Sequence, residues 1–324
     1  MLALAPPPRT RPNRTPRPSE YEKGKRKAMK NPSSPALMAA TDICPHRFID
    51  TRTLGLVEFD EDSFIPPYAM FSHTWSKGNE VVYDEFIHPQ AETFSKLGYH
   101  KIRDACRQAR RDGIRYIWVD TCCVKQGNHE DVVANITSMY AYYQNAEVCY
   151  VYLVDAKDTS RRDMFGERGA YYWWGGSLWF RRGWTLQELL APQTVVFFNK
   201  RWRQIGNKHE LRGDIHQRTT IPITVLSGEQ SIQDVDVFTR ISWAMDRETT
   251  RGQDQAYCLQ GLLGITVVPS YVISRYASFD LLSQVLSDAY PELEKRLGIR
   301  HNLFSDLNGG RLYLLLSERC RRRT

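Results

Sequence analysis

Along residues 44–198, stretches of apolar residues alternate with segments in which apolar positions recur at helical spacing. Residues 114–119 and 148–154 are nearly continuous apolar runs, typical of strands buried on both faces. Between strands of this kind, residues 100–112 and 128–146 carry apolar residues at helical spacing. The other predicted elements are a hairpin at 48–59, a strand at 68–71, a helix at 184–190 and a strand at 194–198. This alternation predicts an α/β fold, with a parallel sheet of roughly four or five strands and helices on both faces.

Beyond residue 198 the pattern is weaker. Helices are expected at residues 209–218 and 236–245, and Asp254 is a candidate N-cap for a helix at 255–263. Residues 279–297 fit one or two helices. We therefore divide the chain into an N-terminal arm (1–40), a folded domain (41–268) and a poorly defined C-terminal region (269–324).

The N-terminal arm has a composition unlike the rest of the chain. Its 40 residues include eight prolines, nine Lys/Arg and two Glu, and they account for the whole net charge of +7. Such a segment buries too little to offset the entropy of ordering, so we expect disorder. A nuclear signal around residues 23–27 and a mitochondrial presequence are the alternatives, although the prolines disfavour the helix that a presequence needs. Because the remainder is neutral, we do not expect nucleic-acid binding.

The cysteines and the apolar runs indicate in which cellular compartment the protein is expected. Seven cysteines are present, an odd number, and no C-x-x-C pair has zinc spacing. We expect reduced thiols, no metal site and a cytoplasmic protein. Cys122 and Cys123 are a conceivable redox pair, but as neighbours in a strand they would point to opposite faces. The sequence contains no apolar run near the ~20 residues of a membrane span and no secretory signal, so no membrane association is expected.

Residues 177–192, SLWFRRGWTLQELLAP, concentrate aromatic and basic side chains around one carboxylate. Glu188 is the sole acidic residue between Glu167 and Glu210, and it follows Trp184 by one helical turn. One interpretation is an ion pair with Arg181 or Arg182 that fixes a corner of the fold. The other is a partly desolvated functional carboxylate.

Polar residues follow the predicted strands at the points where ligands bind in open parallel sheets. Each has an ordinary structural interpretation: an aspartate can cap a turn, a histidine can be buried and satisfied, and Trp75 can belong to the core. Taken together they favour a ligand pocket on one rim of the sheet. The residues expected there are Ser72, His73, Asp120, Asp155, Arg182 and Glu188.

Several other chemistries fit poorly. The sequence lacks G-x-G-x-x-G after a strand, G-x-x-x-x-G-K-[ST] and G-x-S-x-G, so neither a Rossmann site, a P-loop nor a nucleophile elbow is indicated. Cys122 or Cys123 with His73 as base is conceivable, but neither thiol has an evident activating neighbour.

Several long segments together resemble the fungal heterokaryon-incompatibility (HET) domain family. The segments are DTRTLGLVEF (50–59), PPYAMFSHTW (66–75), KIRDACRQARRDGIRYIWVDTCCV (101–124), NITSMYAYYQNAEVCYVYLVD (135–155), SLWFRRGWTLQELLAP (177–192) and RISWAMDRETTRGQDQAYCLQGLLGI (240–265). They cover about residues 47–268. The chain departs from the family pattern at Ser76, where glycine is usual, at Lys125, where an acidic residue is usual, and over residues 267–279.

The resemblance implies a cell-death effector in recognition between genetically different fungal cells. It also implies a flavodoxin-like fold similar to the Toll/interleukin-1 receptor (TIR) domain, some members of which cleave NAD at its glycosidic bond. Trp184 and Glu188 are similar to the W-x-x-x-E segment of those enzymes, so the resemblance makes Glu188 the expected catalytic residue. NAD would be a substrate rather than a cofactor. The residues expected to bind it are Ser72, His73, Trp75, Asp120, Asp155, Arg182 and Trp184.

The resemblance implies protein partners, namely further copies of this chain and a separate sensor protein. Many TIR domains act without catalysis, by self-assembly. The alternative function is therefore a signalling adaptor, in which His73, Asp120 and Glu188 would be structural. An open cleft around these three residues favours the enzyme, and closure by salt bridges favours the adaptor.

Overall fold

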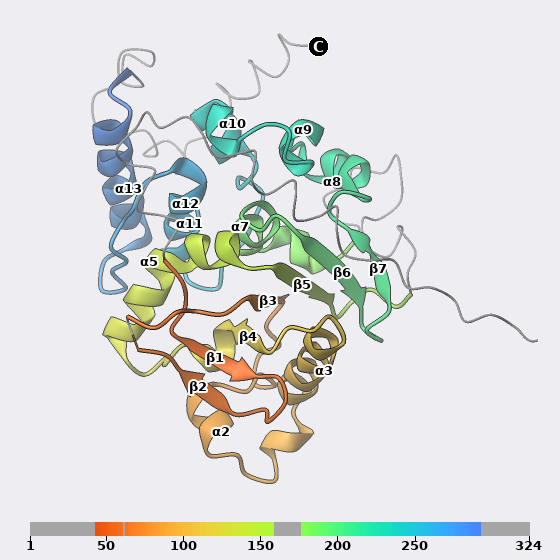
Figure 1. Ribbon diagram of the computed structural model, residues 1–324. Helices are drawn as coiled ribbons and strands as arrows, with labels where there is room; N and C mark the ends of the chain where they lie inside the picture. The colour runs from red at the N-terminus through yellow and green to blue at the C-terminus, as the bar shows by residue number, and fades with distance from the viewer. Residues whose placement is uncertain (1–42, 61, 159–175, 293–324) are drawn as a thin grey trace, which may run out of the picture. The chain divides into compact units, whose positions relative to one another are not determined.

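The computed structural model describes residues 43–60, 62–158 and 176–292 (Figure 1). Its centre is a seven-stranded sheet with the order β2-β1-β4-β3-β5-β6-β7. The strands are β1 (Arg47–Asp50), β2 (Leu56–Glu58), β3 (Tyr68–His73), β4 (Tyr116–Val119), β5 (Val148–Leu153), β6 (Val195–Asn199) and β7 (Gln204–Asn207). The predicted arm, residues 1–40, lies outside the described residues.

The four central strands are parallel and the outer ones are antiparallel. β3 pairs in parallel with β4 and β5, and β5 pairs in parallel with β6. The β1–β2 hairpin joins β4 with Ile49 opposite Ile117, and β7 joins β6. The α/β class and the parallel central strands are confirmed, but the sheet has seven strands instead of four or five, with antiparallel pairs at both edges. The hairpin continues the sheet at one edge, and the sequence of β7, QIGN, has no apolar run that would have indicated a strand.

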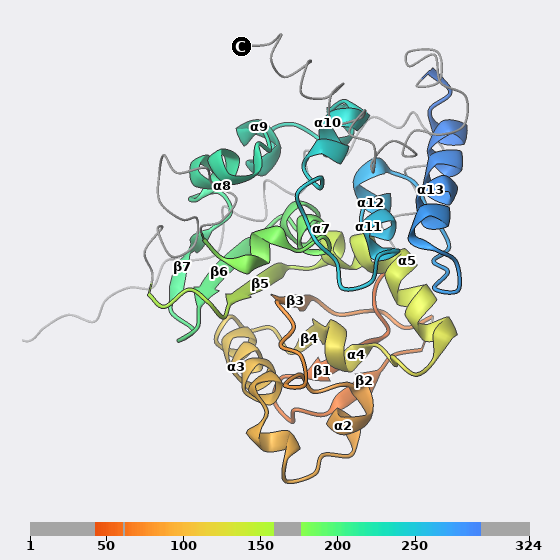
Figure 2. The ribbon, with the colours of Figure 1, turned by 180° about the vertical axis from the view of Figure 1, so that it is seen from behind.

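Helices cover both faces of the central strands. α3 (Leu97–Arg111) lies on one face, whereas α5 (His129–Asn145) and α7 (Thr185–Leu190) lie on the other (Figures 1 and 2). Every residue of β3 and β5 is buried, as the continuous apolar runs predicted. α5 begins directly after Asn128, whose side chain accepts a 3.0 Å hydrogen bond from the backbone N–H of Asp131. The predicted strands and helices up to residue 198 are thus present, with ends shifted by a few residues.

The region after β7 is helical. Its elements are α8 (Arg212–Thr219), α9 (Ile223–Leu226), η3 (Ile232–Asp234), α10 (Val237–Ser242), α11 (Asp254–Tyr257), α12 (Gln260–Leu263) and α13 (Arg275–Ala289). The single helix predicted at 255–263, with Asp254 as its N-cap, is wrong: two short helices form, and Asp254 lies inside the first. α13 is capped by Ser274, whose side chain accepts a 3.1 Å hydrogen bond from the N–H of Ala277. Part of the region that the sequence left poorly defined therefore folds.

Cys122 and Cys123 lie in the short helix α4 (Asp120–Cys123), not in a strand. Both are buried free thiols. The Cys122 thiol donates to the carbonyl of Val81 at 3.2 Å, and the Cys123 sulfur accepts from the N–H of Val119 at 3.4 Å. Burial raises the pKa of both thiols, that of Cys123 to about 12. These contacts explain the two residues as packing groups rather than a redox pair.

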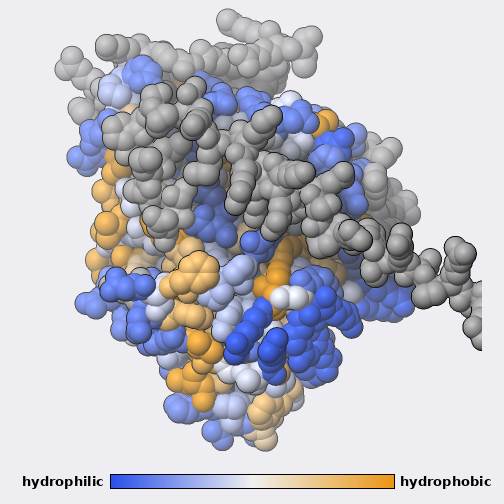
Figure 3. Space-filling view, viewed as in Figure 1, coloured by the Kyte–Doolittle hydropathy of each residue, from blue (hydrophilic) through white to orange (hydrophobic). Residues whose placement is uncertain are grey.

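Two short elements, α2 (Tyr83–Ile87) and η1 (Thr93–Ser95), connect β3 to α3. On the face seen in Figure 3, hydrophobic surface forms narrow strips between hydrophilic residues. A mixed surface of this kind is ordinary for a protein in contact with water. Within the described residues, no helix has the length and apolar character needed to cross a membrane.

Candidate functional site

A cavity of about 250 Å³ opens where β3 and β4 end. α5, α7 and the segment 250–271 supply its other walls. It therefore lies at the carboxyl ends of parallel strands, as predicted. Six of the eight predicted site residues line it: His73, Trp75, Asp120, Arg182, Trp184 and Glu188.

Glu188 reaches the cavity from α7 and is buried. Its Oε2 accepts a hydrogen bond from the hydroxyl of Ser72, and that hydroxyl in turn accepts a 2.7 Å bond from the indole N–H of Trp179. Tyr143 on α5 also hydrogen-bonds to the carboxyl group. Ser72 is thus a positioning residue for Glu188 instead of a wall of the cavity.

Burial raises the pKa of Glu188 to about 8. The charge of Asp120 acts in the same direction, whereas hydrogen bonds from Ser72 and Tyr143 and the charge of Arg182 oppose it. The carboxyl group accordingly holds its proton at neutral pH. A cation placed beside it would favour the ionised form and release that proton.

The predicted ion pair between Glu188 and Arg181 or Arg182 does not form. Arg181 pairs with Glu248 at 2.9 Å, and the Arg182 guanidinium donates to the hydroxyl of Thr250 at 2.7 Å. The two arginines attach the segment after α10 to the start of α7. The interpretation of Glu188 as a paired structural carboxylate is therefore wrong for the described residues.

Gly183 allows that segment to approach α7 closely. Its N–H donates to the carbonyl of Glu248 at 2.9 Å. A Cβ at this position would lie 2.6 Å from Cγ2 of Thr249 and 3.1 Å from the sulfur of Cys258. Arg247, which is buried, donates to the carbonyl of Arg182 at 3.0 Å and fastens the same junction.

Asp120 stands on the opposite wall, directly after β4. Its Oδ2 accepts a 2.8 Å hydrogen bond from the indole N–H of Trp75. Its Oδ1 is buried and has no hydrogen-bond partner among the described residues. Burial raises the pKa of Asp120, against the lowering effects of His73 and Trp75. A buried oxygen without a partner beside a cavity is available to a donor or cation on a ligand.

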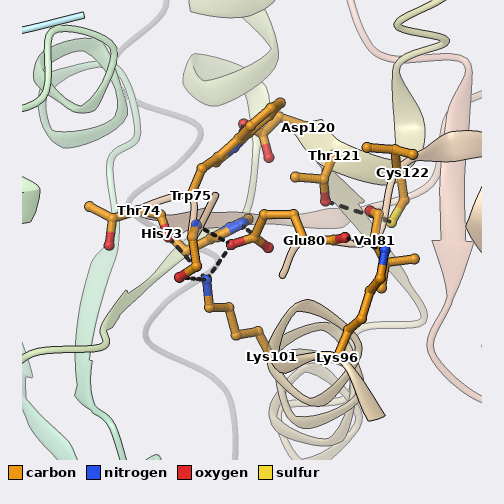
Figure 4. Close-up of polar contacts among 12 residues, drawn as sticks. His73, Thr74, Trp75, Glu80, Val81, Lys96, Lys101, Asp120, Thr121 and Cys122 are labelled. Carbon is orange, nitrogen blue, oxygen red and sulfur yellow. Dashed lines mark hydrogen bonds and ion pairs between the residues drawn. The ribbon is translucent and has the colours of Figure 1, made fainter. Parts of the chain in front are cut away.

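His73 belongs to a buried network behind Asp120 (Figure 4). Its Nε2 lies 3.3 Å from Oε2 of Glu80, whose other oxygen accepts a 2.5 Å hydrogen bond from the ammonium group of Lys101. Although burial raises the pKa of Glu80, His73 and Lys101 outweigh this and lower it to about 2. Lys101 also donates to the carbonyl of Thr74 at 3.0 Å. This network fixes the β3 end from which His73 and Trp75 enter the cavity.

Asp155 does not reach the cavity. Its carboxylate accepts hydrogen bonds from the hydroxyl of Ser177 at 2.6 Å and the N–H of Leu178 at 2.7 Å. It thereby holds the start of η2 (Leu178–Arg181). Asp155 therefore caps a turn, which is the structural interpretation of this residue. It does not line the cavity, so the geometry gives no support to its predicted part in ligand binding.

Six polar or aromatic residues of the cavity were not predicted: Gln126, Thr185, Thr250, Arg251, Asp254 and Tyr271. The Asp254 carboxylate accepts a 2.6 Å hydrogen bond from the Tyr271 hydroxyl and is also hydrogen-bonded by Trp184. The Arg251 guanidinium lies 4.5 Å from the centre of the Tyr271 ring. The available signal was the polar run Glu248 to Arg251, which the sequence alone did not bring near β3.

The site therefore combines three carboxyl groups with raised pKa, Asp120, Glu188 and Asp254, and two arginines, Arg182 and Arg251. Apolar side chains of α5 complete the lining. Over residues 43–60, 62–158 and 176–292, no cluster of three His, Cys, Asp or Glu has the placement of a metal site. Such a cavity suits a small ligand with a cationic ring and an anionic group.

Comparisons with known proteins agree with the resemblance. Residues 68–174 match the family described as heterokaryon incompatibility protein (HET). The chain is 43% identical over 201 residues to vegetative incompatibility protein HET-E-1 of Podospora anserina, an alignment that covers 62% of this chain and 15% of that protein. The chain thus matches a small part of the relative's length. No solved structure matches significantly.

Proposed function

We propose that this chain acts in heterokaryon incompatibility as an effector of the cell-death response, because residues 68–174 match the heterokaryon incompatibility (HET) family. The name of the relative, a vegetative incompatibility protein, supports this role. The match to a small part of that relative supports a portable domain that works with further modules or partners.

The proposed chemistry is hydrolysis of the N-glycosidic bond of NAD. The bond between C1′ of the ribose and the pyridinium nitrogen breaks, and its electron pair goes to nicotinamide. Water adds to C1′ and loses a proton, so that the products are nicotinamide, ADP-ribose and one proton. The observation that carries this proposal is Glu188, a buried carboxyl group with a raised pKa that lines a cavity at the carboxyl ends of parallel strands.

Glu188 would act by charge. The pyridinium cation favours ionisation of the carboxyl group as it binds, and the resulting carboxylate stabilises the positive charge that develops on the ribose as the bond breaks. Ser72 and Tyr143 hold the carboxyl group in place. Asp120 would supply a second acceptor for the same cationic part.

The alternative is a non-enzymatic adaptor that works by self-assembly. Closure of the site by salt bridges would favour it. Within the described residues, however, Glu188 and Asp120 line an open cavity without an ion pair, and His73 alone is held by a charged network. This difference supports the enzyme.

The test is NAD consumption by the full chain, fused to an oligomerising module because homotypic assembly is expected. Glu188→Gln is the matched variant, since an amide closely mimics the protonated carboxyl group present at pH 7. We expect nicotinamide and ADP-ribose from the unaltered chain and none from Glu188→Gln. Intact NAD with a folded, assembled unaltered chain would refute the enzyme and favour the adaptor.

A further inference from the structure

The two arginines of the cavity act on the buried carboxyl groups of Glu188 and Asp254 by charge alone, at longer range than an ion pair. Arg182 donates to the hydroxyl of Thr250, and Arg251 stacks on Tyr271. Among the described residues, no carboxylate lies within ion-pair distance of either guanidinium. Both line the cavity, so both present donors to whatever enters it. Guanidinium groups in this situation are typical phosphate ligands.

Asp254 is an acidic residue on the same wall as the arginines, and its carboxyl group is already hydrogen-bonded. Its carboxyl group is buried and receives hydrogen bonds from Tyr271 and Trp184. It also feels the charges of Arg251 and Arg182 at longer range. Asp254 therefore orients this wall and neutralises part of its charge, but within the described residues it accepts no hydrogen bond from either arginine.

The acidic and basic walls belong to different parts of the fold. Asp120 begins α4, whereas Arg251 precedes α11, and Figure 2 shows α11 above and α4 below the level of β3. Between them, Val132, Ile136 and Met139 of α5 offer apolar surface for a ring. A ligand that spans the cavity would meet Asp120 at one end and Arg251 at the other.

The size of the cavity limits that ligand. About 250 Å³ lies just below the range of roughly 300–1,000 Å³ typical of pockets for drug-sized molecules. This space suits one nucleotide and is too small for a dinucleotide. An extended dinucleotide would leave its second half outside.

From these observations we infer that Arg182 and Arg251 form a phosphate subsite, and that the unit recognised is a mononucleotide with a cationic base. In terms of the proposed function, this unit is the nicotinamide mononucleotide half of NAD, with the adenosine half outside the cavity. The identity of the base rests on the proposed function, whereas the phosphate subsite rests on the two arginines.

The test measures binding without turnover, by calorimetry on the full chain with Glu188→Gln. The probes are nicotinamide mononucleotide and nicotinamide riboside, which differ by the phosphate. We expect the mononucleotide to bind at least about tenfold more tightly, since a charged hydrogen bond to phosphate contributes about 1.5 to 3 kcal/mol. Arg251→Met, which retains the length of the side chain over Tyr271, should abolish most of that difference, and Arg251→Lys should restore part of it.

Arg201→Ala is the control, because Arg201 is an exposed arginine outside the cavity. It should leave both affinities unchanged. Equal affinity for the two probes, or a difference that survives Arg251→Met, overturns the subsite even if the unaltered chain hydrolyses NAD. A phosphate-dependent difference that Arg251→Met removes supports the subsite, even if NAD remains intact and the proposed hydrolysis fails.

Discussion

Gly183 joins two segments that are distant in sequence, and a single methyl group there tests how tightly they pack. Gly183→Ala places a Cβ 2.6 Å from Cγ2 of Thr249 and 3.1 Å from the sulfur of Cys258. Overpacking of this kind costs about 1 to 3 kcal/mol. We expect a corresponding loss in the free energy of unfolding, measured in urea.

Two further variants test whether the loss of stability comes from crowding against Thr249 or from replacing any glycine by alanine. Thr249→Ser removes Cγ2 and retains the hydroxyl that donates to the carbonyl of Arg251 at 2.6 Å, so it should rescue Gly183→Ala. Gly213→Ala in α8 meets nothing within 4 Å and should stabilise the fold by about 0.5 to 1 kcal/mol. If Thr249→Ser gives no rescue, the close contact is not the cause of the loss.

Glu188 makes the stability of the fold depend on pH. Its ordinary pKa is 4.5, and in the folded chain burial raises the pKa to about 8. Between these two values unfolding releases a proton, so the free energy of unfolding falls as pH rises from about 4.5 to 8. Glu188→Gln removes this effect. We expect the variant to gain stability relative to the unaltered chain from pH 5 to pH 8, by on the order of a few kcal/mol.

Urea unfolding of both proteins at the two pH values measures this gain, and titrating groups that do not interact with Glu188 cancel in the difference. An equal difference at pH 5 and pH 8 would mean that Glu188 titrates normally. In that case the carboxylate would already be charged, and its proposed response to a cation would lose its basis.

Among the elements, α7 is short and depends on buried cations at both ends. At its start Arg247 donates to the carbonyl of Arg182 and the hydroxyl of Thr185. At its end the buried ammonium group of Lys208 donates to the carbonyls of Leu189 at 3.2 Å and Pro192 at 2.5 Å. A six-residue helix has little stability of its own, so these bonds fix the position of Glu188.

We therefore predict that Lys208→Met lowers the free energy of unfolding by about 1.5 to 3 kcal/mol, because the two carbonyls lose a charged donor. Burial lowers the pKa of Lys208 to about 8. The measurement is therefore best made at pH 6, where the ammonium group is charged. Lys200→Met, at an exposed position, is the matched control and should be neutral. Equal stability of the two variants would show that α7 needs no support from Lys208.

The elements that sequence periodicity predicted share one property: their apolar residues meet the core directly. β3 and β5 are buried throughout, and α3 buries Ile102, Ala105 and Cys106 at helical spacing. β7 was missed because main-chain pairing to β6, and not an apolar pattern, makes it a strand. Cys122 and Cys123 were treated as strand neighbours because α4 follows β4 directly and, with four residues, is too short to show helical periodicity.

For the molecule as a whole, the segment that matches the HET family is smaller than the unit that folds. Residues 68–174 end before β6 and α7, and they begin after the hairpin that covers the edge of β4. We predict that residues 43–292 unfold cooperatively in urea, whereas residues 68–174 alone do not. Cooperative unfolding of the shorter piece, monitored by near-ultraviolet circular dichroism, would contradict the requirement for β1, β6 and α7.

The sequence predicted those site residues that follow strands or have unusual neighbours, and it missed those placed by contacts between distant segments. His73 and Asp120 were found because parallel strands bring their carboxyl ends to one edge, and Glu188 because of its unusual neighbours. Arg251 and Tyr271 follow no strand. They reach the cavity through Gly183, the Arg181–Glu248 ion pair and the Asp254 hydrogen bonds, which are contacts between distant segments that one sequence does not display.

The late position of these wall residues has a consequence for biosynthesis. A ribosome makes His73, Asp120 and Glu188 well before Arg251 and Tyr271, and chains fold from the N-terminus as they emerge. The nascent domain therefore carries its key carboxylate on an unfinished cavity until nearly all of the described fold has been made. A product of premature termination after α7 would contain Glu188 yet lack the wall that completes the site.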